Sequence, residues 1–224
     1  MADATPRPHW VRLGVWIALV ASLAGAGYAI RFSHAHRTTH VSVYSFSTFA
    51  GGMIQYAAIL GVVLLICINR LDLLALRRPS SWRRSLALAA VVIVAILAWE
   101  AIVNALPLPQ SPGSEQGITD VRWEPAHAAA FAANVFLFAI FGPFVEELTF
   151  RGAGQSLLRF LGRTPSILLI GVAFGLWHGL LEALLVLIPF GVALAWLRDR
   201  TDSVLPGYFV HALFNAAALA LIFS

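Results

Sequence analysis

The chain has 224 residues, of which 59% are hydrophobic and only 12% carry a charge. Soluble domains contain about 45–50% apolar and about 25% charged residues, so these proportions exclude a water-soluble globule. They also exclude a disordered chain, which would be poor in apolar residues. The single cysteine, Cys67, excludes an internal disulfide scaffold. The formal charge of +4 comes from 15 basic residues, all arginine, spread between apolar runs. This distribution is typical of membrane-protein loops and does not form a nucleic-acid-binding patch.

Seven apolar runs approach the length of about 20 residues that a transmembrane helix needs. In chain order they are 13–30, 49–68, 86–106, 126–150, 166–178, 180–197 and 204–223. The fifth run is short, which leaves its boundary with the sixth open. We therefore predict an all-α, polytopic integral membrane helix bundle of about seven transmembrane helices, within a range of six to eight. The first run exceeds the apolar core of a signal peptide, which favours a retained signal anchor.

The arginine residues predict an orientation, because cytoplasmic loops of membrane proteins are enriched in basic residues. Three predicted loops are rich in arginine: 69–85, 151–164 and 198–202. The loop 107–125 instead holds three acids against one arginine. We expect the arginine-rich loops and the N-terminus to be cytoplasmic and the C-terminus to lie outside. A short chain whose basic residues are all arginine favours a bacterium of high GC content, and hence the bacterial inner membrane.

A stretch rich in proline, glycine and serine, 107–117, is the only linker-like segment of the sequence. It separates a three-span region, 1–106, to which no role is assigned, from a second region, 126–223. All of the polar clusters described next belong to the second region. Ionisable residues inside a membrane are costly and are therefore functional candidates.

The first polar cluster lies at the end of the fourth run and contains Glu146, Glu147 and Arg151. Glu147 and Arg151 are four residues apart on a helix and are expected to form an ion pair. Glu146 then has no partner nearby in sequence, and a buried, unpaired glutamate is suited to act as a general base. An ordinary surface pair at a helix end reaching interfacial water is the alternative interpretation.

The second cluster centres on His178 in the fifth run. The residues around Gly162 indicate a turn, and a hairpin centred there places Glu146 and His178 about 16 residues before and after it. At 1.5 Å per residue the two side chains would reach a similar depth in the membrane. A lone histidine in an apolar helix is also often a hydrogen-bonded core residue.

The third cluster consists of His211 and Asn215 in the last run. Their spacing of four residues places both on one face of a helix. Both can donate hydrogen bonds, which suits an oxyanion-stabilising pair and equally a structural polar seam between helices.

Together these residues favour the hydrolysis of a polar bond, with the glutamate taking a proton from water and a histidine holding that water. No serine or cysteine stands beside them, so a covalent nucleophile is not favoured. Glutamate and histidine are also normal zinc ligands. No H-E-x-x-H motif is present, so no cofactor is predicted and zinc is neither assigned nor excluded.

The three clusters resemble the motifs of the CPBP family of intramembrane proteases, which includes the CAAX prenyl endopeptidases and bacterial Abi-type proteins. The sequence from Gly142 to Gly152, GPFVEELTFRG, is similar to the first motif. Phe174-x-x-x-His178 matches the second motif and His211-x-x-x-Asn215 the third, in the family's order. The resemblance covers about 126–223, and the first three spans match nothing specific.

Membership of this family would imply an all-helical intramembrane endopeptidase of the glutamate type. By resemblance, Glu146 activates the water with help from His178, and His211 with Asn215 forms the oxyanion hole. Three further residues are expected to support this site: Glu147, Arg151 and Phe174. The expected substrate is a peptide or membrane protein, lipidated or not, within the lipid bilayer. No nucleic-acid partner is expected, and the sequence does not indicate an oligomeric state.

Two other classes of function remain open on the sequence alone. A non-catalytic bacteriocin-immunity or scaffold membrane protein would keep the polar cluster for packing or binding. A transporter or proton relay would also bury glutamate and histidine, but it would need polar groups along a whole path.

Overall fold

The computed structural model describes residues 9–33, 42–106 and 123–221. Within these residues the chain forms seven helical stretches and no strand. They are α1 (Trp10–Phe32), α2 (Phe46–Ile66), α3 (Trp82–Asn104), a long stretch Pro125–Leu161 that contains α4 to α6, α7 (Arg163–Trp177), α8 (Leu184–Thr201) and α9 (Leu205–Leu221). This confirms the predicted all-α, polytopic membrane fold. The predictions that concern residues 1–8, 34–41, 107–122 and 222–224, including the whole linker-like segment 107–117, lie outside the described residues.

Four of the helical stretches, α1, α2, α3 and Pro125–Leu161, are long and apolar enough to cross a membrane. Within the most apolar 18-residue segment of each helix, the share of residues buried inside the protein is 17% in α1, 17% in α2 and 22% in α3. The corresponding share in Pro125–Leu161 is 39%. The first three helices therefore present most of their apolar surface to the outside, as helices in contact with lipid do. The fourth stretch is the most enclosed of the four.

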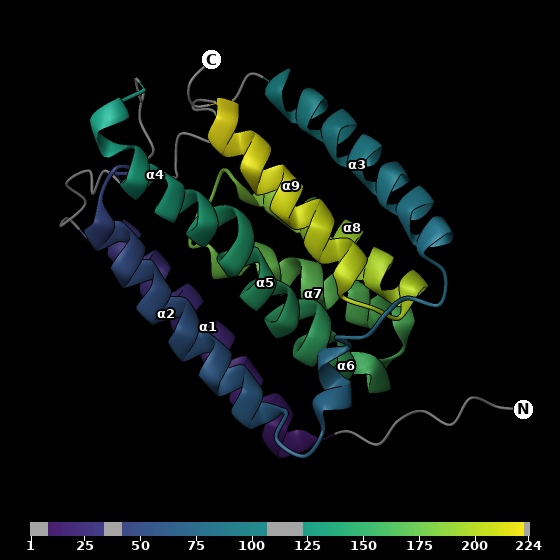
Figure 1. Ribbon diagram of the computed structural model, residues 1–224. Helices are drawn as coiled ribbons and strands as arrows, with labels where there is room; N and C mark the ends of the chain where they lie inside the picture. Colours follow the sequence, from purple (N-terminus) through teal and green to yellow (C-terminus); the bar gives the residue numbers. More distant parts are fainter. Residues whose placement is uncertain (1–8, 34–41, 107–122, 222–224) are drawn as a thin grey trace, which may run out of the picture.

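The helix Pro125–Leu161 passes through the middle of the bundle. Figure 1 shows it between the α1–α2 pair on one side and α8 with α9 on the other, while α3 lies outermost beside α8 and α9. One hydrophobic core includes residues from all of these helices, among them Trp16 of α1, Val63 of α2 and Val92 of α3. The three-span region and the second region thus share a single core.

This central helix contains two wider, π-helical segments. In order, α4 (Ala128–Val135), η4 (Phe136–Phe141), α5 (Gly142–Glu147), η5 (Leu148–Gly154) and α6 (Gln155–Leu158) follow one another, and η4 and η5 are the π-helical ones. Segments of this kind inside α-helices occur frequently at functional sites. They flank α5, the short element that carries both glutamates of the first motif.

The predicted fourth run was too short, and two of the arginines that were assigned to loops, Arg151 and Arg198, are buried in helices. The helix does not end at residue 150 but continues to Leu161, and α8 extends through Arg198 to Thr201. Arg151 is completely buried in the central helix, and Arg198 is buried at the end of α8, where its Nη2 donates to the Ser156 hydroxyl at 2.8 Å. A paired or hydrogen-bonded arginine can remain in the interior, so its charge does not mark a loop.

The predicted hairpin around Gly162 is confirmed. Gly162 has a φ of +96°, a backbone conformation that glycine adopts without strain, and it separates the central helix from α7. The open boundary between the fifth and sixth runs is also settled, because α7 ends at Trp177 and α8 begins at Leu184. These two helices pack closely: a Cβ on Gly171 would lie 2.8 Å from the Val192 nitrogen of α8.

The three arginine-rich loops meet at one end of the bundle. The amide of Val204, just before α9, donates to the Ala75 carbonyl at 3.1 Å, and Arg77 pairs with Asp202 at 2.8 Å. Asp199 also pairs with Arg163, in the turn after the central helix, at 2.7 Å. All three loops therefore face the same side, as the predicted number of spans requires. Their assignment to the cytoplasm stays a prediction.

Candidate functional site

Both glutamates of the first motif are buried inside the bundle. Glu146 is 5% exposed and Glu147 is 1% exposed, although both lie on the short element α5. A carboxylate in such surroundings needs a partner to offset the loss of its hydration. The two side chains find different partners, which gives them different chemical roles.

Glu147 is the centre of a buried ionic cluster. Its Oε1 accepts a hydrogen bond from Arg151 Nη1 at 2.8 Å and lies 3.0 Å from His211 Nδ1. The predicted pair between Glu147 and Arg151 is thus confirmed. Arg151 also donates from Nη2 to the Gly191 carbonyl at 3.2 Å, and its guanidinium lies 4.2 Å from the centre of the Phe174 ring. The charge of Glu147 is therefore compensated, and the carboxylate fixes the position of His211.

The other oxygen of Glu147 is enclosed by the first turns of α9. A Cβ placed on Gly207 would lie 3.1 Å from Glu147 Oε2, closer than ordinary van der Waals contact. A glycine at this position lets the α9 backbone approach the carboxylate. Gly207 stands one turn before His211, so this contact and the hydrogen bond to His211 align α9 with α5.

Glu146 has a partner that the sequence analysis missed. The hydroxyl of Tyr56, on α2, donates to Glu146 Oε1 at 2.6 Å. The other oxygen, Oε2, lies 3.7 Å from His211 Nε2, beyond hydrogen-bond distance. The expectation of an unpaired glutamate was therefore wrong, but the partner is a neutral hydroxyl that lies 90 residues earlier in the chain. A search for ionisable residues within spans passes over a tyrosine in an apolar run, although a buried tyrosine hydroxyl usually has a partner.

His178 is the capping residue at the end of α7 and is half-buried. Its Nδ1 lies 2.8 Å from the Phe174 carbonyl oxygen, one turn earlier. A ring nitrogen next to a carbonyl oxygen carries a hydrogen, so Nδ1 donates, and in the neutral form of the imidazole Nε2 then carries the lone pair. The histidine can therefore accept a hydrogen bond from water through Nε2.

The ring of Phe174 packs against three other aromatic rings in and beside the site. Its ring centre lies 4.8 Å from that of His178, 5.6 Å from that of His211 and 5.4 Å from that of Phe150. It is 1% exposed and, as described above, also supports the guanidinium of Arg151. The phenylalanine of the second motif thus holds both histidines in edge-on contact.

The structure brings some of the expected residues together and leaves others apart. Glu146, Glu147, Arg151 and His211 form one contact network. Asn215, one turn beyond His211 on α9, donates instead from Nδ2 to the Phe138 carbonyl at 2.9 Å. In the described part of the chain, neither His178 nor Asn215 hydrogen-bonds to Glu146. Both lie beside the network and not within it.

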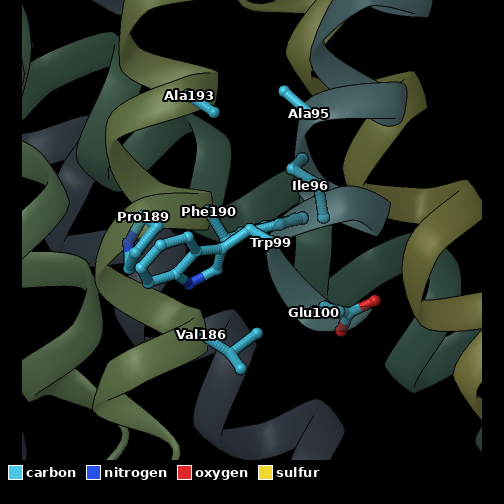
Figure 2. Close-up of a pocket in the computed structure, with 8 residues that line it drawn as sticks. All are labelled: Ala95, Ile96, Trp99, Glu100, Val186, Pro189, Phe190 and Ala193. Atoms are coloured by element: carbon cyan, nitrogen blue, oxygen red, sulfur yellow. The ribbon is translucent and has the colours of Figure 1, made fainter. Parts of the chain in front are cut away.

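A cavity of about 170 Å³ lies between α3 and α8 (Figure 2). It is lined mainly by apolar side chains, and Glu100 is its one carboxylate. Phe190 forms part of its wall, and the same ring lies 5.1 Å from the ring of His211. Phe190 therefore separates the apolar cavity from the polar network.

Glutamate and histidine are zinc ligands, so the site can be tested for its fit to a metal ion. Among the described residues, no three His, Cys, Asp or Glu side chains gather as a group that could hold a metal. Glu147 is already engaged by Arg151 and His211. The described residues therefore give no support for placing a metal ion at this site.

The structure is thus an all-helical bundle with membrane-spanning helices, in which two buried glutamates lie beside His211. Residues 128–217 match the family model described as type II CAAX prenyl endopeptidase Rce1-like. This match agrees with the resemblance of the three motifs, and the matched segment spans all three of them. Over these residues the chain is therefore similar to CAAX-type membrane proteases. No curated protein and no solved structure matches the chain.

Proposed function

We propose that this protein is an intramembrane endopeptidase that uses Glu146 to activate a water molecule. The observation that carries the proposal is that the two glutamate carboxylates have different partners. Glu147 is neutralised by Arg151 and fixed to His211, whereas Glu146 is held only by a neutral hydroxyl and keeps Oε2 without a hydrogen-bond partner within the described residues. A buried carboxylate in this state is suited to accept a proton.

The attacking water would be held between Glu146 and His178. Glu146 Oε2 accepts one proton of the water, and the lone pair on His178 Nε2 accepts a hydrogen bond from the other. The water oxygen then bonds to the carbonyl carbon of the scissile peptide. When the tetrahedral intermediate collapses, the C–N bond breaks and Glu146 gives its proton to the leaving amine.

The negative oxygen of the intermediate would be stabilised by His211 and Asn215. His211 donates from Nε2 when it is protonated, and its positive charge is balanced by Glu147, which lies at Nδ1. Asn215 Nδ2 uses one hydrogen for the Phe138 carbonyl and has a second to donate. Removing one donor of this kind typically lowers kcat by about 10²–10³-fold.

The proposed substrate is a peptide bond in a membrane-associated peptide or membrane protein. Prenylated substrates are those named for the matching family, and the chain could act on lipidated or unlipidated peptides. We place the N-terminus in the cytoplasm, because the three arginine-rich segments meet at one end of the bundle. The bacterial inner membrane is proposed from the short chain and its all-arginine set of basic residues.

The test is cleavage of a quenched fluorescent peptide library, prenylated and unprenylated, by the purified chain in detergent. Glu146→Gln and His178→Ala variants and a zinc chelator are compared with the wild type. We expect turnover that is lost in Glu146→Gln, strongly reduced in His178→Ala and unchanged by the chelator. Turnover that survives Glu146→Gln would refute the proposal, and a cellular phenotype that survives it would favour a scaffold or immunity protein.

A further inference from the structure

Tyr56 comes from a part of the chain that the family match does not include. The match begins at residue 128, whereas Tyr56 lies on α2, in the three-span region. Its hydroxyl nevertheless donates to Glu146 Oε1 at 2.6 Å, a short hydrogen bond of the kind that a carboxylate forms with a hydroxyl. The three-span region thus reaches the glutamate that the proposed function places at the centre of the reaction.

The first motif makes room for the Tyr56 ring. A Cβ on Gly142 would lie 3.0 Å from Tyr56 Cζ and 3.1 Å from its Cε2, which is tighter than nine in ten real Cβ contacts. The neighbouring Phe141 ring meets the Tyr56 ring edge-on at 6.4 Å. The ring therefore lies over the first turn of α5, on the element that carries Glu146. This fit indicates a built contact between α2 and the motif.

The hydrogen bond distinguishes the two oxygens of Glu146. Oε1 is engaged by Tyr56, and Oε2 is directed toward His211, 3.7 Å from its Nε2. Without the hydroxyl, no described side chain would hydrogen-bond to either oxygen, and the carboxylate could rotate. A general base acts efficiently only when the oxygen that takes the proton is held in position.

We propose that Tyr56 is a positioning residue for Glu146, so that α2 of the three-span region completes the catalytic site. The inference rests on the proposed function, because it assigns Tyr56 a role through the glutamate. It also gives the three-span region a role, because α2 is then part of the catalytic unit and not only a membrane anchor.

The test compares Tyr56→Phe with the wild type in the peptide-cleavage assay, in detergent, on the full chain. Phenylalanine keeps the ring and its packing but removes the hydroxyl. We expect kcat to fall about 10- to 100-fold, the factor that corresponds to one hydrogen bond to a charged group. KM should change by less than about 2-fold, because the hydroxyl contacts the base and not the substrate. The melting temperature is measured alongside.

Tyr208→Phe is the matched control. Tyr208 lies on α9 and its ring meets Phe144 edge-on at 5.7 Å, but no hydrogen bond joins it to Glu146 within the described residues. Removing its hydroxyl should leave kcat and KM unchanged. A loss of activity in both variants would show a general sensitivity to hydroxyl removal and would overturn the specific role of Tyr56.

A double-mutant cycle separates positioning from structure. Glu146→Asp withdraws the carboxylate by one methylene from the Tyr56 hydroxyl, so Tyr56→Phe should lower kcat far less in that background than in the wild type. Equal losses in both backgrounds, or a loss explained by a smaller folded fraction, would overturn the inference. If Glu146→Gln abolishes turnover but Tyr56→Phe matches the wild type, only the inference fails. If Glu146→Gln keeps full turnover, the proposed function fails with it.

Discussion

Replacing Arg151 by methionine is expected to destabilise the protein strongly. Arg151 is fully buried and Glu147 is 1% exposed, so the variant would leave a buried carboxylate without its permanently charged partner, with only His211 beside it. Breaking a buried pair on one side costs about 3–5 kcal/mol, because the remaining charge stays desolvated. The lost hydrogen bond to the Gly191 carbonyl and the contact with the Phe174 ring add to this cost.

The size of the effect can be followed as a melting temperature in detergent. For a chain of this size, each kcal/mol corresponds to about 2–4 °C, so the expected decrease is roughly 6–20 °C. The double variant Arg151→Met with Glu147→Gln removes both charges and should recover most of this loss. Its activity should stay low, because a glutamine cannot balance the charge of a protonated His211.

The control is an ion pair with solvent contact. Arg70 and Asp72 form a salt bridge at 2.9 Å, but their side chains are 41% and 56% exposed. Arg70→Met should leave the melting temperature nearly unchanged, because exposed pairs contribute little. An Arg151→Met variant as stable as the wild type would refute the reasoning. So would a double variant no more stable than Arg151→Met, since the unpaired charge would then not be the cause.

Two further substitutions test the surroundings of the site. In Gly207→Ala, the new methyl group should press against Glu147 Oε2 and lower kcat about 10-fold. The control is Gly61→Ala, whose methyl group would face open space and should leave kcat unchanged. Equal kcat values in both variants would contradict the close contact at Gly207. Phe190→Ala should cost about 3–5 kcal/mol of stability and join the apolar cavity to the space beside His211. The melting temperature measures this cost, and an undiminished value would show that the ring contributes little to the packing beside His211.

The local features of the site could be read from short stretches of sequence. The pair between Glu147 and Arg151 follows from a spacing of four residues on a helix. The hairpin follows from Gly162, whose positive φ ends the central helix before α7. Such predictions succeed because helix geometry relates residues within a few turns, whatever surrounds them.

Other features depended on partners far away in the chain. The length of the central helix was underestimated because Arg151 was interpreted as a loop charge, whereas Glu147 and the carbonyl of Gly191 compensate it in the interior. Asn215 shares the predicted face with His211, but its contact with the Phe138 carbonyl could not be foreseen. The helical repeat shows which residues share a face and does not show what lies opposite that face.

The sequence by itself determined that the chain is a helical membrane protein, because the length and composition of its apolar runs decide how it partitions into lipid. It also singled out the candidate site residues, since only a few ionisable groups stand inside those runs. Only the tertiary structure decided how the two glutamates differ. Arg151 and His211 compensate one of them, and Tyr56 reaches the other from 90 residues away. Packing between helices decides such contacts, because it depends on the shapes of all the side chains at once and not on local spacing.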